Sequence, residues 1–142
     1  MKYLLDTCVI SELISRQPNQ RVVDWIDGVD PAQLYLSVIT IGEIQKGIEK
    51  LSDSPRKAEL REWLQQNLLV RFRSLILPLD LDTMLVWGTA TGKLARQGTP
   101  LPAIDSLIAA LAIRYDLTLV TRNVADFQRT QIRIFNPWDE TA

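Results

Sequence analysis

Short apolar stretches alternate along the chain with longer segments whose apolar residues recur every three or four positions. The short stretches predict strands at residues 3–5, 34–37, 75–77, 118–121 and 132–135. The longer segments predict helices at residues 9–14, 21–26, 40–51, 81–96 and 102–115, and one that begins at Pro55 with Leu60, Trp63, Leu64 and Leu68 on one face. This alternation is typical of an α/β fold with a central, mainly parallel β-sheet flanked by α-helices.

The composition fits one domain in a reducing compartment. The 142 residues contain no linker-like or repetitive segment, so residues 1–142 are expected to form a single domain. Cys8 is the only cysteine, which excludes an internal disulfide and favours a cytoplasmic protein. The first residues lack the basic start and cleavage site of a signal peptide, and no uncharged apolar run has the length of a membrane span, so no membrane association is expected.

The chain contains no histidine, which narrows its chemistry. Nucleophilic machinery of the Ser–His or Cys–His kind and histidine metal sites are excluded. Carboxylates remain, and these bind hard cations such as Mg²⁺ or Mn²⁺. The net charge is −1, from 16 Lys and Arg against 17 Asp and Glu, so an RNA substrate would need local basic patches or metal ions to attract its phosphates.

Acidic and amide side chains follow the predicted strands at the point where each strand ends. Asp6 directly follows the first strand, and Glu43 and Asp105 fall in the first turns of two predicted helices. Asn123 and Asp126 follow a later strand. Because the carboxyl ends of parallel strands share one edge of the sheet, these side chains are expected on one rim. Gathered carboxylates repel one another, and a divalent cation removes the repulsion while activating a water for phosphodiester hydrolysis.

Each of these acidic residues also has a purely structural interpretation. Asp6 would be the N-cap of the helix that follows it, and Glu43 would form a capping box with Thr40. Asp105 would complement the dipole of its helix, and Asp126 would be a solvated turn residue. The functional interpretation therefore rests on several acids at matching positions in successive strand–helix units.

Other polar and aromatic residues give weaker signals. Arg122, Arg129 and Arg133 lie near the predicted rim and are candidates for contacts with phosphates, although surface arginines are more often simply solvated. Three tryptophans lie on apolar helix faces and are expected in the core or at an interface: Trp25, Trp63 and Trp87.

The sequence resembles the PIN-domain family at four segments that occur in the family's order. These are residues 4–12, 36–44, 105–110 and 120–127, which read LLDTCVISE, LSVITIGEI, DSLIAA and VTRNVADF. The segments at 21–26 and 135–138 further resemble the VapC/FitB branch, the toxins of type II toxin–antitoxin pairs. The resemblance spans nearly the whole chain.

The resemblance implies a PIN-like fold and a Mg²⁺- or Mn²⁺-dependent endoribonuclease that hydrolyses RNA phosphodiester bonds with a metal-activated water. By motif position, Asp6, Glu43 and Asp105 would be the catalytic, metal-binding acids. Asp6 and Asp105 would ligate the metal directly, and Glu43 would do so directly or through a water. The motif positions also supply accessory residues: Thr7, Thr121, Asn123 and Asp126.

The resemblance further implies partners. The chain would form a homodimer and bind a small VapB- or FitA-like antitoxin encoded beside it. That antitoxin would block the acidic site, with an arginine near the carboxylates, and would bind operator DNA. The RNA substrate could be transfer, ribosomal or messenger RNA.

Two positions depart from the family's pattern. Cys8 stands where the family usually has Asn, and Asn123 stands where many relatives carry a fourth acid. Asn123 brings no charge. The sequence therefore leaves open whether Asn123 or Asp126 fills the fourth position, and whether the site holds one metal or two.

Two alternatives come from other functional classes. A catalytically weak PIN-like module would act mainly by binding its antitoxin partner and nucleic acid, which the uncharged Asn123 would allow. A phosphotransfer protein, such as a haloacid-dehalogenase-type phosphatase or a receiver domain, is disfavoured. Those phosphatases need a second Asp two positions after the first, where this chain has Cys8.

Overall fold

The computed structural model describes residues 1–139 and arranges them around one five-stranded sheet. Its strands lie at the predicted positions: β1 (Tyr3–Leu5), β2 (Leu34–Ser37), β3 (Ile76–Leu77), β4 (Thr118–Val120) and β5 (Ile134–Phe135). The order is β3-β2-β1-β4-β5 and every neighbouring pair is parallel, so the predicted parallel sheet is confirmed. The carboxyl ends of the strands therefore meet at one edge of the sheet.

The strand order reverses at the middle of the sheet. From β1 the chain passes to β2 and β3 on one side, and it then returns to β4 and β5 on the other side. Open α/β sheets bind ligands at such a switch point, beyond the carboxyl ends of the strands. The N–H of Asp6 donates to the carbonyl of Val120 (3.0 Å), which joins the segments that follow β1 and β4 at this point.

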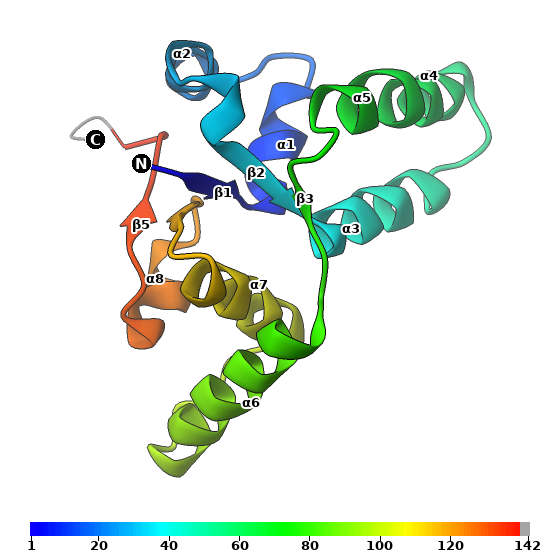
Figure 1. Ribbon diagram of the computed structural model, residues 1–142. Helices are drawn as coiled ribbons and strands as arrows, with labels where there is room; N and C mark the ends of the chain where they lie inside the picture. Colours follow the sequence, from blue (N-terminus) through cyan, green and yellow to red (C-terminus); the bar gives the residue numbers. More distant parts are fainter. Residues whose placement is uncertain (140–142) are drawn as a thin grey trace.

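Helices cover both faces of the sheet (Figure 1). On one side lie α1 (Thr7–Leu13), α2 (Gln20–Gly28), α4 (Pro55–Trp63) and α5 (Leu69–Arg71), and on the other lie α6 (Leu81–Arg96), α7 (Ala103–Arg114) and α8 (Val124–Phe127). The remaining helical elements are α3 (Val38–Glu49), η1 (Pro31–Gln33), the π-helical η2 (Leu64–Leu68) and η3 (Gln128–Thr130). None of the helices described for residues 1–139 combines the length and the apolar character that crossing a lipid bilayer requires.

Each face of the sheet has its own apolar cluster, because successive strand residues point to opposite faces. Leu5 and Val120 belong to the cluster that contains buried residues of α1, α2 and α3. The neighbouring Leu4 and Leu119 belong to the cluster that contains buried residues of α7 and α8. Strands that are buried on both faces are nearly continuously apolar, which is why the sequence shows short apolar runs in place of alternation.

The helix that begins at Pro55 is not the continuous α-helix that the apolar spacing predicted. α4 passes into η2, in which the N–H of Leu69 bonds to the carbonyl of Leu64, five residues earlier. The buried residues Leu64, Leu68 and Phe72 recur every four positions, a longer spacing than the α-helical repeat of about 3.6 residues. The wider π-helical turn keeps these side chains facing the core.

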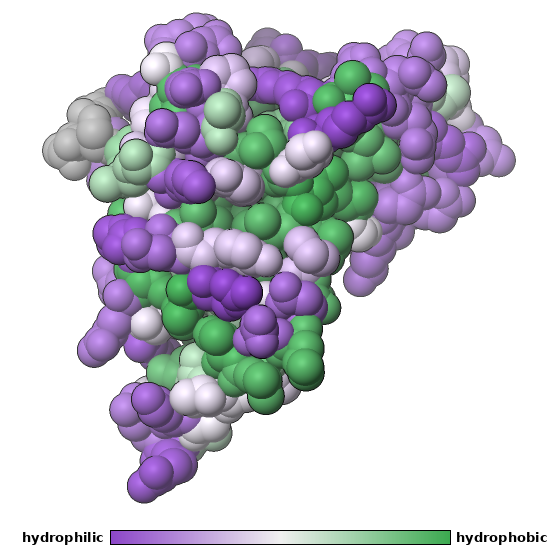
Figure 2. Space-filling view, in the orientation of Figure 1, coloured by the Kyte–Doolittle hydropathy of each residue, from purple (hydrophilic) through white to green (hydrophobic). Residues whose placement is uncertain are grey.

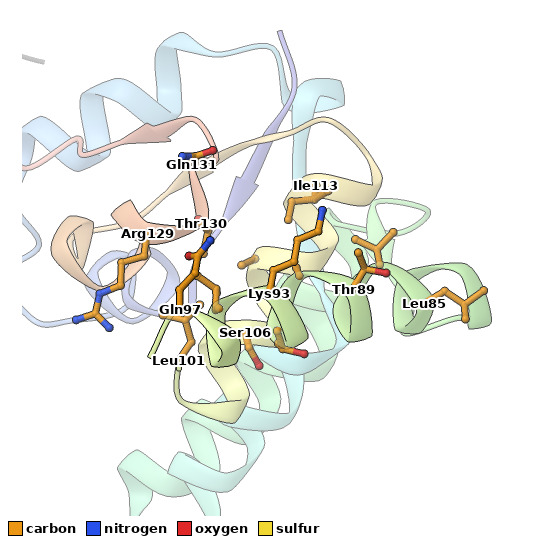
Figure 3. A pocket seen from close by; sticks show the side chains of 15 residues that line it. Leu85, Thr89, Lys93, Gln97, Leu101, Ser106, Ile113, Arg129, Thr130 and Gln131 are labelled. Carbon is orange, nitrogen blue, oxygen red and sulfur yellow. The ribbon is translucent and has the colours of Figure 1, made fainter. Parts of the chain in front are cut away.

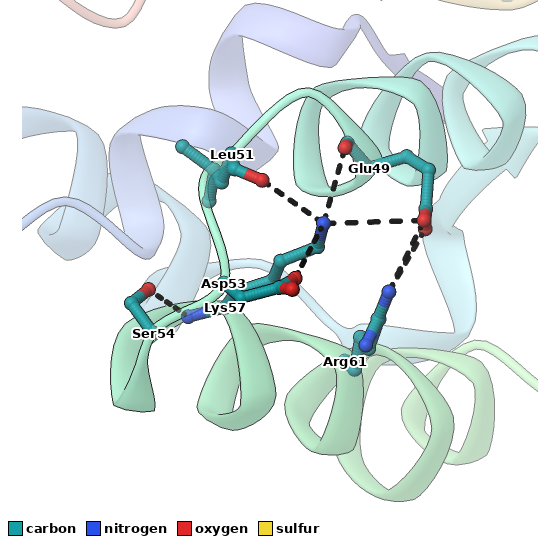
Figure 4. A network of polar contacts seen from close by, with 6 residues as sticks. All are labelled: Glu49, Leu51, Asp53, Ser54, Lys57 and Arg61. Atoms are coloured by element: carbon teal, nitrogen blue, oxygen red, sulfur yellow. Dashed lines mark hydrogen bonds and ion pairs between the residues drawn. The ribbon is translucent and has the colours of Figure 1, made fainter.

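A buried lysine joins α3 to α4 (Figure 4). The ammonium group of Lys57 donates to the carbonyl oxygens of Glu49 (3.2 Å) and Leu51 (2.9 Å), where α3 ends. It also pairs with the carboxylates of Asp53 (3.5 Å) and Glu49 (3.9 Å). Carbonyl groups at a helix C-terminus have no partner within the helix, so the lysine satisfies them and fixes the turn between the two helices.

Candidate active site

Asp6 stands at the carboxyl end of β1 and uses both of its carboxylate oxygens. Oδ1 accepts a hydrogen bond from the N–H of Thr7 (2.8 Å), so Asp6 is the N-cap of α1. Oδ2 accepts a hydrogen bond from the hydroxyl of Thr121 (2.8 Å) and lies 3.8 Å from the thiol of Cys8. The cap therefore accounts for only one oxygen, and the other ties the end of β1 to the segment that follows β4.

The environment of Asp6 makes its negative charge unfavourable. The residue is 6% exposed, and burial raises the pKa of its carboxyl above the usual value. Hydrogen bonds from Thr121 and Thr7 oppose this rise because they stabilise the charged form, whereas the charge of Glu43 adds to it. A cation bound beside Asp6 would remove this cost.

Glu43 lies in the second turn of α3, one turn later than predicted, because the helix begins earlier, with Ser37 as its N-cap. Ser37 Oγ accepts the N–H of Thr40 (3.1 Å), so the capping box of Thr40 and Glu43 does not form, and that interpretation is wrong. The Thr7 hydroxyl lies 2.6 Å from Glu43 Oε1 and 3.0 Å from Thr40 Oγ1. Since a hydroxyl carries one proton, Thr7 donates to the carboxylate and accepts from Thr40. This contact links Glu43 to the first turn of α1.

Asp105 lies in the first turn of α7, as predicted, and its side chain is half-buried. Burial raises the pKa of its carboxyl, and the charges of Asp6, Asp126 and Glu43 raise it further. These neighbours come from the end of β1, from α8 and from α3. The fold therefore brings acids from distant parts of the sequence within electrostatic reach of Asp105.

The segment after β4 presents the accessory residues in different ways. Thr121 is fully buried, and its hydroxyl accepts the N–H of Asn123 (3.0 Å) while it donates to Asp6. Asn123 is exposed, and its side chain does not cap α8. Asp126 is exposed in the first turn of α8, and its charge contributes to the raised pKa of Asp105. Asp126, and not the neutral Asn123, gives this segment its acidic character.

The candidate arginines occupy three different environments. The guanidinium group of Arg122 lies over the ring of Trp138, 5.0 Å from its centre. Arg129 lines a cavity between α6, α7 and η3 (Figure 3). Arg133 pairs with Asp116 (2.9 Å), which precedes β4. The predicted place of Arg133 on the rim is therefore wrong, because residues that precede parallel strands lie at the opposite edge of the sheet.

The donor chemistry of the site fits a hard divalent cation. Its donors are carboxylate and hydroxyl oxygens, and burial raises the pKa of the Cys8 thiol, so no thiolate favours a softer metal. Within residues 1–139, no three Cys, Asp or Glu side chains stand close enough together to hold an ion by themselves. Mg²⁺ is usually held by one or two carboxylates and keeps several waters, so two of these acids are enough to anchor it.

Sequence reasoning missed the polar contacts that hold the site. Trp138 donates its indole N–H to Glu12 (2.8 Å), and its ring supports Arg122 beside the segment after β4. In the sequence, residues 135–138 show only a resemblance to the VapC/FitB branch. A contact between α1 and the last described residues leaves no local pattern that a reader of the sequence can detect.

Comparison with known proteins identifies relatives over almost the whole chain. Residues 3–132 match the PIN domain. The chain is 37% identical over 137 residues to "Toxin FitB" of Neisseria gonorrhoeae, covering 96% of this chain and 99% of that protein. It is 31% identical over 136 residues to "VapC ribonuclease Y4jK" of Sinorhizobium fredii, covering 96% and 97%. The solved "Structure of FitAB bound to IR36 DNA fragment" contains a chain with a TM-score of 0.91 and 36% identity, covering 96% of each chain.

These similarities agree with the architecture of the chain. They confirm the resemblance to PIN domains and to the VapC/FitB branch that the sequence motifs indicated. The chain therefore belongs to the PIN-domain family.

Proposed function

We propose that this PIN-domain chain is an endoribonuclease that requires Mg²⁺ or Mn²⁺, and that it acts in the cytoplasm as the toxin of a toxin–antitoxin pair. The proposal rests on the acids at the carboxyl edge of the sheet, where burial and neighbouring negative charges raise the pKa of both Asp6 and Asp105. Relatives that are named VapC ribonuclease and Toxin FitB support the same class of activity.

In this proposal Asp6 and Asp105 are the direct metal ligands, and Glu43 acts directly or through a water. Two threonines hold these acids in place. The Thr121 hydroxyl occupies one oxygen of Asp6, and the Thr7 hydroxyl occupies one oxygen of Glu43. Hydrogen bonds of this kind orient ligating carboxylates and restrict their rotation.

When bound, the divalent cation lowers the pKa of a water and offsets the charge that develops on the phosphate. The chain itself supplies no histidine, so its carboxylates must serve both to bind the ion and to move protons. In this proposal the exposed Arg122 and Arg129 contact phosphates of the RNA. Protons compete with the cation for Asp6 and Asp105, so metal binding strengthens as the pH rises through their raised pKa values and levels off above them.

Cleavage of total cellular RNA by the purified chain, with and without Mg²⁺, tests the proposal. We expect cleavage only with metal, and its loss in Asp6→Asn and Asp105→Asn. Asp116→Asn is the matched control, since Asp116 pairs with Arg133 at the opposite edge of the sheet, and it is expected to cleave as the wild type does. A folded Asp105→Asn protein that cleaves RNA at the wild-type rate in Mg²⁺ would overturn the proposal.

We further propose that the chain forms a homodimer through the apolar surface at the start of α6. Leu81 and Leu85 are 75% and 63% exposed there, and Leu85 lines a cavity together with Ile113 of α7. Figure 2 shows apolar atoms over the first half of α6 and hydrophilic atoms over its end. Grouped exposed apolar side chains are typical of interaction surfaces. A Leu81→Glu, Leu85→Glu variant is expected to sediment as a monomer, and an unchanged dimer would place the interface elsewhere.

The proposed partner of the toxin is a small VapB- or FitA-like antitoxin that carries it to operator DNA. The solved relative FitAB is bound to a DNA fragment, which supports this assignment. A guanidinium group pairs bidentately with carboxylates, so an antitoxin arginine near Asp6 and Asp105 would block the site. Replacing candidate arginines in the partner and measuring the recovery of RNA cleavage tests this inhibition.

The alternative is a catalytically weak PIN-like module that acts mainly by binding its antitoxin and nucleic acid. Two observations favour it: Asn123 is neutral, and within the described residues no three acids stand at ligating distance. Calorimetric titration of Mn²⁺ into the antitoxin-free chain separates the two functions. Heat of binding that disappears in Asp105→Asn supports the nuclease, and the absence of binding supports the module.

A further inference from the structure

Trp87 on α6 makes a hydrogen bond that reaches the first turn of α7, where Asp105 lies. Its indole N–H donates to the hydroxyl of Ser106 (2.9 Å), and that hydroxyl donates to the carbonyl of Ala103 (2.6 Å). Ser106 directly follows Asp105 and is 4% exposed. It lies at the wall of the cavity of about 580 Å³ between α6 and α7 (Figure 3).

The start of α7 lacks the kind of side-chain cap that α1 and α3 possess. α1 is capped by the side chain of Asp6 and α3 by that of Ser37. The N-cap of α7 is Pro102, which makes no side-chain cap bond. An uncapped first turn opens more readily, because its N–H groups have no intrahelical partner. The contact from Trp87 through Ser106 therefore supplies an anchor where the cap is missing.

Electrostatic repulsion also acts on the first turn of α7. The negative charges of Asp6, Asp126 and Glu43 act on Asp105 and repel it. Opening of the uncapped turn would relieve that repulsion and move the carboxylate away from the other acids. α6 packs mainly against α7, so an anchor on α6 opposes this movement.

We infer that Trp87 and Ser106 are positioning residues, whose hydrogen bond keeps Asp105 within reach of the acids after β1 and in α3. The inference rests on the proposed metal site. Neither residue touches the substrate or the metal, and both act through the backbone of the first turn of α7. Their loss should therefore weaken metal binding while the fold is retained.

Four variants test the inference by calorimetric titration with Mn²⁺. Trp87→Phe removes the indole N–H and keeps an aromatic ring, Ser106→Ala removes its acceptor, and the double variant removes both. Each single variant is expected to weaken Mn²⁺ binding about fivefold, the effect of losing about one hydrogen bond. The double variant should bind Mn²⁺ as Ser106→Ala does, because Ser106→Ala already removes the bond to Trp87. Trp63→Phe is the control, since Trp63 packs in the cluster on the other face of the sheet, and wild-type affinity is expected.

Amide hydrogen exchange in the metal-free protein gives a second, independent measurement. The N–H groups of Ser106 and Leu107 should exchange faster in both single variants than in the wild type or Trp63→Phe. Wild-type Mn²⁺ affinity and wild-type exchange in Trp87→Phe and Ser106→Ala would overturn the inference, even if their melting temperatures fall. A wild-type protein that binds no Mn²⁺ would overturn the proposed metal site, and the exchange rates alone would then decide whether the anchor exists.

Discussion

Replacement of Thr121 by valine removes the hydroxyl that holds Asp6 and keeps the shape of the side chain. The hydroxyl donates to Asp6 Oδ2 at 2.8 Å, and the two residues are 0% and 6% exposed. Valine leaves this buried oxygen with only the thiol of Cys8, at 3.8 Å, as a donor. It also removes the acceptor of the Asn123 N–H (3.0 Å). We therefore expect Thr121→Val to destabilise the protein whenever Asp6 is charged.

The magnitude follows from the charge on the acceptor. A hydrogen bond to a charged group contributes about 1.5–3 kcal/mol, which corresponds to a further rise of roughly one to two units in the pKa of Asp6. The folded-state pKa of Asp6 is already above its ordinary value of 3.8, which means that the folded protein favours the protonated form of this carboxyl. The stability that protonated Asp6 contributes is therefore lost as the pH rises through the folded pKa. The loss in Thr121→Val is thus largest near neutral pH, and at acid pH, where Asp6 is protonated in the folded protein, only the part that does not depend on the Asp6 charge remains.

Urea unfolding of the metal-free protein at about pH 7 and about pH 4 measures this effect. Thr118→Val is the matched control, because Thr118 begins β4, which Thr121 directly follows, is 5% exposed, and accepts only a long hydrogen bond (3.4 Å) from Arg133. At pH 7, Thr121→Val should be about 2 kcal/mol less stable than Thr118→Val, and the difference should shrink at pH 4. Equal stability of the two variants at pH 7 would refute the idea that Thr121 stabilises the charged form of Asp6.

Asp105→Asn should stabilise the metal-free protein above the folded pKa of Asp105, since that pKa is raised and Asn never ionises. Melting temperatures of the variant and the wild type, measured between about pH 4 and pH 8, should converge at the acid end. An equal melting temperature at pH 8 would contradict the repulsion. Thr7→Val should weaken Mg²⁺-dependent RNA cleavage, while Thr7→Ser, which keeps the donor to Glu43, should retain it; equal rates would exclude a role for that hydroxyl. Lys57→Met should lower the free energy of unfolding in urea by about 2–4 kcal/mol, because carbonyls at the end of α3 lose their donor. Arg61→Met, which breaks an exposed ion pair, should lower it by under about 1 kcal/mol. Similar losses in the two variants would contradict the role of Lys57 as a buried cap.

The class of fold could be predicted from the sequence, whereas the order of its strands could not. Strands that are buried on both faces read as short apolar runs, and the runs that contain Leu4 and Leu119 are easily recognised. The order β3-β2-β1-β4-β5 depends on which strands pair, and pairing leaves no mark within a single run. The π-helical turn around Leu68 also escaped prediction, because the spacing of apolar residues alone does not report how wide a helical turn is.

The positions of Asp6 and Asp105 could be predicted because Asp6 follows a strand and Asp105 lies near the start of a helix, which are local properties. The contacts that hold them were not predictable, since Thr7 donates to Glu43 and Thr121 donates to Asp6 across the tertiary structure. The prediction that Arg133 lies on the rim was wrong because it relied on closeness in sequence alone. Its closeness in sequence to the rim suggested a shared edge, but it precedes β5 and pairs at the far edge of the sheet.

The structural and functional interpretations of these acids do not exclude one another, because one carboxylate can stabilise a helix start and also bind a metal. This double role explains how a chain of net charge −1 places several acids near one edge of its sheet. Asp6 caps α1, and Asp105 and Asp126 lie in the first turns of α7 and α8. The positive end of a helix dipole favours a negative charge in its first turn, so these helix starts offset part of the repulsion among the carboxylates. The offset is incomplete, because burial and neighbouring charges still raise the pKa of Asp6 and Asp105. The repulsion that remains is what a bound divalent cation would relieve, which makes metal binding and the helix caps two parts of one electrostatic balance.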